Sequence, residues 1–477
     1  MAEKHKGIRT QHPEYAANVD TWKQCRDASA GERAIHDGGT AYLPMLTKET
    51  DADYRARKAR TPFFNATWRT IAGLKGMLFR NAPQIEVPAG IAPYMADVDM
   101  AGTPVAMFTQ ELAEEVLEVG RGGLLVDAPP LPETADGQPL TQAQAESLGL
   151  RPMLQYYPAE SVINWKTARV ANVVQLVLVV LKEETPAGDD PYSHKTETRY
   201  RELTLTPEGY RQRVFRINDK DEDEQVGPDI FPTARGQRFA YIPFMFVGTD
   251  DCKPEVELPP LLDLIDMNVH HYQVSADWEH GCHFQGLPTL FVSGWNGDSD
   301  APIYIGGPTA NGLADPNAKA WFAEVQSNFE AIRNNLQDKQ SQMAVLGARM
   351  LENSKPSVEA ADTLRQRSQG EQSALSAFAE VLGMAMTRAL SWMAEWAGAA
   401  GEVSVKINKE FIPTALDAPT LTAIVAGWQA GVPGMSGQNV YAYMQRTGMA
   451  DPEVKYEEEQ ERIASSGPRG DSGLLVS

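Results

Sequence analysis

The stretch that decides the fold is residues 258–286, LPPLLDLIDMNVHHYQVSADWEHGCHFQG. Apolar residues recur along it at steps of three and four: Leu261, Ile265, Val269, Tyr272 and Ala276. This spacing places them on one face of a helix. The two prolines after Leu258 suit a first turn, where the backbone N–H groups have no helical partner. We predict one long helix, closed by Gly281 and Gly286.

Two further long helices follow along the chain. Asp315 and Pro316 are typical residues for the start of the second helix. Its apolar stripe is Phe322, Val325, Phe329, Ile332, Leu336 and Met343. The third helix begins after Pro356 and buries Leu375, Phe378, Leu382, Ala385, Ala389, Trp392 and Trp396. Residues 287–294 and 303–308 read as short strands joined by a turn-rich loop, so the first two helices enclose a small β tip.

The remaining chain mixes helices with a strand-rich segment, so the predicted fold class is α+β. Helices are predicted at about 16–28, at 50–80 with a break at Pro62, and at 105–120. Residues 151–247 are predicted to form an antiparallel meander with strands at 161–165, 173–183, 197–205 and 209–217. The charged run 219–224 reads as a loop, and a short strand at 403–407 should rejoin the β-rich body. Short helices are predicted at 420–430 and 437–446, and the tail beyond Pro452 should be frayed.

Composition excludes several classes of protein. The chain of 477 residues is too long for one ordinary core, so we expect about two to four packed units. A formal net charge of −21 argues against a broad basic surface for nucleic acid. The 3 cysteines are scattered and odd in number, which argues against a disulfide framework. The longest apolar run, Val173–Leu181, is too short to span a bilayer and reads as a buried strand, so no membrane is expected.

Two patterns suggest chemistry only weakly. His270, His271, His280 and His283 lie in one window with Cys282, and His and Cys are zinc ligands. Adjacent helical residues, however, point about 100° apart, and no second ligand pair stands at a typical spacing. The run Gly120–Gly123 lies between a helix and a strand, the reverse of a phosphate-binding loop, and indicates a helix C-cap. We expect no catalysis, no metal and no cofactor.

The order of parts is more specific than any motif. An α/β body, a helix, a small β tip, a returning helix, a short break and a long helix resemble the portal protein of tailed bacteriophages, the ring at one capsid vertex through which DNA passes. Short stretches spread over the chain also resemble one portal family: His12–Tyr15 with Trp22 and Cys25–Asp27, Tyr42–Pro44, Gly120–Asp127, Ile163–Trp165, Pro259–Leu261, Leu287–Leu290, Ile305–Pro308 and Leu346–Arg349.

The resemblance implies a portal architecture and a role for each part. Residues 1–257 and 356–415 would form the wing, 258–283 and 316–346 two stem helices, 284–315 the clip, 347–355 the tunnel loop, and 416–477 the crown and C-terminal tail. It also implies a homo-oligomeric ring of about twelve subunits. Double-stranded DNA would pass through it non-specifically during packaging and ejection. Terminase and later head–tail adaptor proteins would dock on the clip, and capsid and scaffold proteins would be further partners. The protein would belong to the virion and assemble in the host cytoplasm.

Three groups of residues become candidates in this interpretation. Gly347 can cap the second helix and Pro356 can start the third, so the chain turns between them. The tunnel-loop residues expected to face DNA are Arg349, Met350, Glu352, Asn353 and Lys355. The clip residues expected to dock partners are Trp295, Asn296, Asp298 and Asp300. The residues expected to pack the stem are Phe329, Ile332 and Leu336.

The charge of the stem and clip agrees with a channel. Residues 258–346 contain ten Asp or Glu against three Lys or Arg, a difference of seven negative charges. A channel that must let DNA slide should not bind it tightly, because each phosphate neutralised by Lys or Arg adds affinity. The acids could equally keep an exposed stalk soluble. A metal-dependent enzyme that uses the His270–His283 window, or another virion structural or adaptor protein, also stays open as an alternative.

Overall fold

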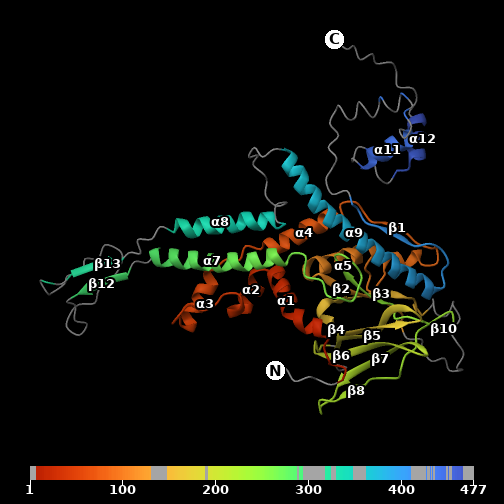
Figure 1. The fold of residues 1–477 in the computed structure, drawn as a ribbon, viewed down its shortest axis with the longest axis horizontal. Coiled ribbons are helices and arrows are strands. Elements are labelled where there is room, and N and C mark those ends of the chain that lie inside the picture. Colours follow the sequence, from red (N-terminus) through yellow and green to blue (C-terminus); the bar gives the residue numbers. More distant parts are fainter. Residues whose placement is uncertain are drawn as a thin grey trace, which may run out of the picture. The chain divides into compact units, whose positions relative to one another are not determined.

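The computed structural model describes residues 7–129, 148–187, 192–286, 289–293, 319–323, 329–347, 361–409, 436–446 and 454–465, with single positions 317, 426, 430, 432 and 450. The chain divides into two compact units, Met1–Lys409 and Glu410–Ser477. The first unit mixes helices with several small sheets (Figure 1). The predicted α+β class is therefore confirmed.

The first part of unit 1 is helical. Its helices are α1 (Pro13–Ala30), α2 (Glu32–Gly38), η1 (Gly39–Ala41), α3 (Asp51–Arg60), α4 (Ala66–Leu78), η2 (Ala92–Ala96) and α5 (Val105–Val119). The helices α3 and α4 separate around Pro62, as predicted. Each has a polar N-cap, since Thr50 accepts a hydrogen bond from the Asp53 amide and Asn65 accepts one from the Trp68 amide.

A short sheet, fully buried in two of its three strands, forms the centre of the unit. Its strands are β2 (Arg121–Asp127), β3 (Met153–Pro158) and β11 (Phe244–Gly248), in the order β11-β2-β3. All of β2 is buried. Gly120 ends α5 in the left-handed region at φ 84°, so the predicted helix C-cap is confirmed. Arg121 is buried over the rings of Trp165 and Phe246, where it cannot meet a phosphate from outside.

The predicted meander is confirmed and gains one strand. The five-stranded sheet follows the chain in the order β4 (Val162–Val170), β5 (Val173–Pro186), β6 (Thr196–Thr206), β7 (Gly209–Ile217) and β8 (Asp223–Gln225). The predicted loop at 219–224 is confirmed at residues 219–222. Residues 223–225 form β8 instead, because they pair with the end of β7. The apolar run at 173–181 is buried only from Val179 onward. Val173 and Val174 are 62% and 63% exposed, because they flank the turn between β4 and β5.

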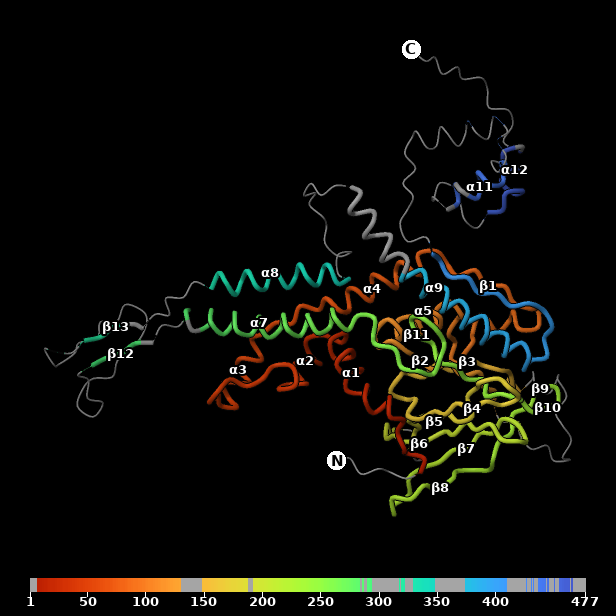
Figure 2. Tube along the Cα trace, viewed as in Figure 1, coloured from red at the N-terminus to blue at the C-terminus, as the bar shows by residue number. Residues whose placement is uncertain are grey.

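The stretch quoted first forms α7 (Leu262–Gly286), which begins just after its two prolines. It runs beside α8 (Glu330–Val345), and the strands β12 (Thr289–Ser293) and β13 (Lys319–Ala323) pair with each other (Figure 2). The predicted apolar stripe of α7 is buried at all five positions. The prediction that Gly281 helps to close this helix is wrong, since the helix continues to Gly286.

The second predicted helix starts too early. Residues 319–323 form β13 instead, and α8 begins only at Glu330. The strand β12 is confirmed, and it pairs with β13, which was not predicted as a strand. The second predicted strand, residues 303–308, lies outside the described part of the chain. The pairing has a simple cause: β12 needs a partner for its backbone groups. It also sets Phe291 directly opposite Trp321, with the rings stacked 5.9 Å apart.

The third long helix is α9 (Ala361–Ala397), which spans about 55 Å at its 37 residues. Gly383 lies inside it, where a Cβ would come 2.9 Å from the carbonyl oxygen of Val405. That glycine lets β14 (Ser404–Lys406) lie directly on the helix. The partner of β14 is β1 (Gln84–Glu86), so this strand does not rejoin the β-rich segment as predicted. The small hairpin of β9 (Thr233–Ala234) and β10 (Gln237–Arg238) meets the end of α9 through Arg235, which donates to the Gly398 carbonyl.

Unit 2 contains α11 (Gly437–Arg446) and α12 (Tyr456–Ser465). The helix at 437–446 is confirmed, and α12 corrects the predicted frayed tail at residues 456–465. Residues 466–477 lie outside the described part of the chain. The two helices are held together by Gln445, which donates to the Val454 carbonyl at 2.7 Å, and by the rings of Tyr441 and Tyr456. The helix predicted at 420–430 falls almost wholly outside the described residues.

One buried amide joins α7 to the rest of unit 1. Asn268 is fully buried, and its Oδ1 accepts hydrogen bonds from the backbone of Ala66 and Thr67 and from the Thr67 hydroxyl. Its Nδ2 donates to the Phe64 carbonyl at 2.8 Å. The amide therefore satisfies the first turn of α4, whose N–H groups have no helical partner.

Among the described helices, none is long and apolar enough to cross a membrane.

Replacing Asn268 tests the junction between α7 and the first turn of α4. We expect Asn268→Ala to lower the free energy of unfolding by about 2–4 kcal/mol, because several buried backbone groups lose their partner. The matched control is Asn335→Ala, at an exposed position of α8, which should cost nothing because Ala is the better helix former. Urea unfolding of both variants measures the difference. Equal midpoints for the two would contradict the assignment.

Candidate functional site

The candidate site is the antiparallel pair α7–α8 with the β12–β13 hairpin. The predicted stem residues Phe329, Ile332 and Leu336 are half-buried and share one side of α8, at steps of three and four. The ring of Phe329 stands edge-on to Trp278, with centroids 6.2 Å apart. Farther along the same side, Met343 and Ala344 are buried. The structure thus places the three residues on the side of α8 that packs on α7, within one subunit.

Gly281 makes this close packing possible. A Cβ at position 281 would lie 2.5 Å from Cε1 of Phe329, closer than carbon atoms approach in proteins. The glycine that sequence reasoning took for a helix end is therefore a contact point in the middle of a helix. The only signal for this role in the sequence was that the helical pattern of apolar and polar residues continues on both sides of Gly281.

The histidine window does not gather into one site. His270 is exposed, whereas its neighbour His271 is buried, so the two rings point apart. The amide of Gln340 lies 3.2 Å from Nε2 of His271, and the ring of Phe64 lies on another side. Burial lowers the pKa of His271, and nearby Lys339 lowers this pKa further. Across the described residues, no group of three or more His, Cys, Asp or Glu is placed to hold a metal ion.

The two helices carry charge very differently. The helix α7 has four acids, Asp263, Asp266, Asp277 and Glu279, and no Lys or Arg. The helix α8 is formally neutral, with two acids and two bases. Its exposed surface is rich in amides: Asn334, Asn335, Gln337, Gln340 and Gln342. Neither helix therefore offers a row of cations to a phosphate backbone.

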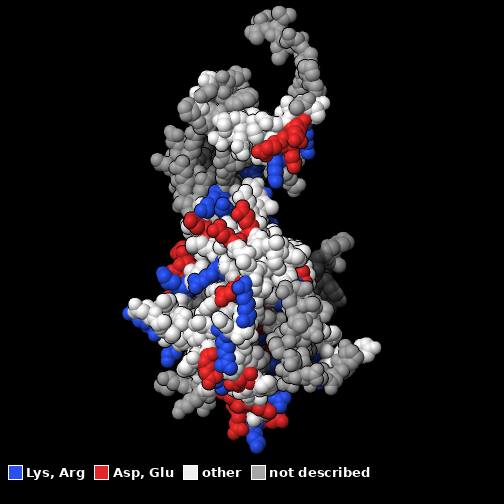
Figure 3. Space-filling model, turned by 90° about the vertical axis from the view of Figure 1, so that its right-hand side faces the viewer, with Lys and Arg blue, Asp and Glu red and all other residues white. Residues whose placement is uncertain are grey.

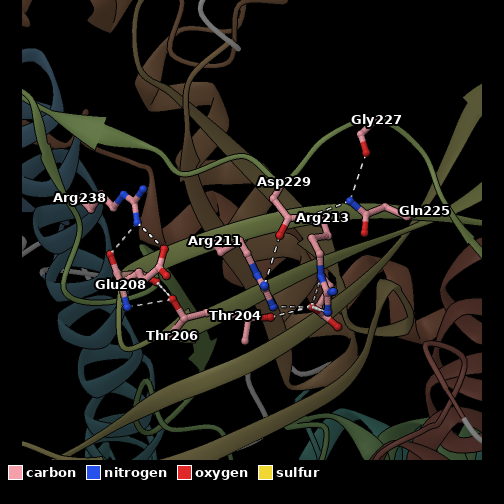
Figure 4. A network of polar contacts seen from close by, with 11 residues as sticks. Thr204, Thr206, Glu208, Arg211, Arg213, Gln225, Gly227, Asp229 and Arg238 are labelled. Atoms are coloured by element: carbon pink, nitrogen blue, oxygen red, sulfur yellow. Dashed lines mark hydrogen bonds and ion pairs between the residues drawn. The ribbon is translucent and has the colours of Figure 1, made fainter.

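Arginines gather elsewhere, on the outer face of the five-stranded sheet, but they are paired. Arg213 contacts Glu202 with Nη2 and Oε1 2.6 Å apart, and Arg211 contacts Asp229 at 3.3 Å. Figure 4 shows these contacts and, beside them, a second group in which Glu208 pairs with Arg238. On the face seen in Figure 3, basic and acidic side chains are likewise interspersed over the described surface. Because the arginines of the sheet already have carboxylate partners, the outer face of the sheet is not a basic patch for nucleic acid.

The β12–β13 hairpin presents an aromatic pair. Phe291 and Trp321 are 48% and 51% exposed, and two strands alone make a marginal sheet in water. This pair was missed by the sequence reasoning, which placed Trp321 in a helix. The predicted clip residues Trp295, Asn296, Asp298 and Asp300 lie outside the described residues, as do the tunnel-loop residues Arg349, Met350, Glu352, Asn353 and Lys355.

Two of the comparisons with known proteins find matches, one with a family of unknown function and one with solved structures. The family described as "Domain of unknown function (DUF4055)" matches residues 260–397, from α7 to the end of α9. No curated protein matches the chain. Solved structures that match the chain include three chains from gene transfer agent (GTA) particles.

A chain from the neck of an empty GTA particle, computed with C6 symmetry, has a TM-score of 0.39 and 11% identity, and the match covers 81% of this chain and 90% of that one. A chain from the virion of a native GTA particle has a TM-score of 0.38 and 11% identity, with coverage of 87% and 99%. A chain from the neck of a native particle, computed with C12 symmetry, has a TM-score of 0.34 and 11% identity, with coverage of 80% and 89%.

The contact at Gly281 can be tested against a matched glycine. Gly73 lies in α4, where a Cβ would meet nothing within 4 Å. We expect Gly73→Ala to raise stability by up to about 1 kcal/mol, as Ala normally does in a helix. Gly281→Ala should lower stability instead, because the methyl group collides with Phe329. Thermal unfolding of both variants measures the opposite signs.

A third variant makes this test specific. In a Phe329→Ala background the collision is gone, so Gly281→Ala should become stabilising. If Gly281→Ala stabilises the protein equally in both backgrounds, the packing assigned to Phe329 is wrong.

Proposed function

We propose that this protein is the subunit of a portal-type ring at a capsid vertex, through which double-stranded DNA enters and leaves. The observation that carries the proposal is the succession of elements in unit 1. A body of helices and small sheets leads into α7, the β12–β13 hairpin, the returning α8 and the 37-residue α9. This succession agrees with the order wing, stem, clip, stem and wing that the sequence resemblance implies.

The surface charge of the stem supports passage of DNA rather than binding of it. In the proposed ring, the exposed amides of α8 other than Gln340, which contacts His271 of α7, face the lumen. Amides hydrate well but do not neutralise phosphates, so they add little salt-dependent affinity. The helix α7 carries no Lys or Arg, so it adds no phosphate contact either. A duplex can then move along such a lining without being held at any one step.

The hairpin β12–β13 has the features of a docking element. Its stacked pair Phe291 and Trp321 is about half-exposed, and aromatic side chains contribute strongly to protein interfaces. We assign this hairpin to the clip, where terminase and then head–tail adaptor proteins bind. The partner-docking role of Trp295, Asn296, Asp298 and Asp300, and the DNA-facing role of Arg349 and Lys355, stay predictions.

In this proposal the subunit carries out no reaction of its own and needs no cofactor. Its partners are other copies of itself, the DNA, terminase, adaptor, capsid and scaffold proteins, and its place is the virion. The histidine window is not a competing site here, since His270 and His271 point apart and His271 already contacts Gln340.

Native mass spectrometry of the purified chain tests the proposal directly. We expect a closed ring of about a dozen subunits, with a central channel visible by electron microscopy. A monomer or dimer at all protein concentrations would rule out a portal, and so would a compact oligomer without a channel.

The lining of the channel has its own test. Asn334→Lys with Gln337→Lys adds two cations per subunit to the exposed face of α8. Assembled rings of this variant should retain linear double-stranded DNA more strongly, with a steeper dependence on salt, because each new phosphate contact releases counterions. The matched control exchanges the two amides, Asn334→Gln with Gln337→Asn, and should behave like wild type. Rings of the lysine variant that retain no more DNA than the control would show that α8 does not face the channel.

A further inference from the structure

We propose that the two flanks of α7 are the two halves of one interface between copies of this chain. The first flank, called the α4–α8 flank, consists of Phe64, Trp68, Arg69, Val345 and Leu346. The second, called the loop flank, consists of Met45, Leu46, Asp263, Asp266 and Asp277. The α4–α8 flank of one copy would bind the loop flank of the next. This inference deepens the proposed ring, because it names the surfaces that would close it.

The α4–α8 flank is an exposed apolar cluster with a cation. Phe64 and Trp68 are each 41% exposed, while Val345 and Leu346 are 51% and 38% exposed. The ends of the two helices lie together, since a Cβ on Gly347 would be 3.3 Å from Thr70 of α4. The guanidinium of Arg69 lies over the Phe64 ring at 5.5 Å.

The loop flank combines two apolar side chains with acids. Met45 and Leu46 are 41% and 43% exposed. Their loop is fixed in place, because Gln273 of α7 donates to the Tyr42 carbonyl and buried Arg57 donates to the Pro44 carbonyl. The exposed carboxylates of α7 lie along the same side: Asp263, Asp266 and Asp277. One exposed cation, Lys48, belongs to the loop as well.

The two flanks lie on different sides of α7. Asn268 and His271 contact α4 and α8, whereas Asp266 and Gln273 contact α1 and the segment after it. Asn268 stands two positions from Asp266, and His271 stands two positions from Gln273. Two positions turn an α-helix by about 200°, so the side chains of each pair point to nearly opposite sides of α7. Figure 1 shows the same arrangement, with α4 and α8 on one side of α7 and α1, α2 and α3 on the other.

This placement favours a second copy of the chain as the occupant. A two-fold dimer buries only one of two unlike surfaces that lie on opposite flanks and leaves the other exposed on both copies. A head-to-tail contact covers both surfaces, and it forms a ring where the rotation between copies closes. Apolar clusters on both flanks also need cover from water. The charges match in sign, because Arg69 would face the three carboxylates of the next copy. A foreign partner would account for only one flank.

Disulfide cross-linking tests the pairing in the full-length chain. We expect the double variant Trp68→Cys with Met45→Cys to give a ladder of covalent oligomers after mild oxidation. A mixture of the two single variants should stop at dimers, and neither single variant should cross-link with itself. Of the native cysteines, Cys25 is buried and Cys252 and Cys282 are half-buried, so wild type provides the background.

The outcomes separate this inference from the ring itself. A closed ring by native mass, with no ladder from the double variant, would overturn the interface and leave the portal proposal standing. Homodimers from Trp68→Cys alone would show a two-fold contact and overturn it too. A chain that is monomeric at all concentrations would overturn both proposals.

A charge variant adds an energetic test. Trp68→Asp should raise the protein concentration for half-maximal assembly by at least about tenfold, because buried Trp side chains are common hot spots. Val174→Asp, at an exposed apolar residue outside both flanks, should leave assembly unchanged. Equal assembly of the two variants, both with unchanged thermal unfolding, would count against the interface.

Discussion

The buried amide of Asn268 is the interaction on which the arrangement of unit 1 depends. It binds the first turn of α4 to the middle of α7, and α7 is the helix that contacts α1, α3, α4 and α8. An amide can satisfy donors and an acceptor together, which an apolar residue at this place could not do. The junction therefore fixes the direction in which α7 leaves the body, and with it the course of the returning α8.

Charge is distributed so that the helical pair and the body have different surfaces. The body pairs its cations with carboxylates, as Arg26 does with Glu115, Glu118 and Glu160, and as Arg213 does with Glu202. The helical pair has few cations, a row of acids on α7 and amides on α8. An acidic protein built in this way can surround a duplex without gripping it, because affinity for DNA follows the number of phosphates that cations neutralise. The proposed channel depends as much on the scarcity of Lys and Arg on α7 and α8 as on the acids and amides that these helices carry.

Two glycines have the same role, which is to let another segment pack closely against a long helix. Gly281 admits the ring of Phe329, and Gly383 admits the backbone of β14. In a sequence both glycines weaken the helical pattern and suggest an end or a bend. In the folded chain they stay helical, because the contact each one allows offsets the small loss of helix propensity. Sequence reasoning cannot distinguish the two roles, since the deciding atoms belong to residues far away in the chain.

The amino-acid sequence by itself determined the elements with a clear period. The apolar stripe of α7, the buried residues of α9 from Leu375 to Trp392, the meander β4–β7 and the cap at Gly120 follow from local spacing and turn chemistry. Only the tertiary structure decided that residues 319–323 are a strand. Their apolar residues have helical spacing, but their backbone pairs with β12 instead. Only it showed that Asn268 is a junction and that two apolar patches lie on opposite flanks of α7. These features depend on which distant segments meet, and a period of three or four residues carries no information about that.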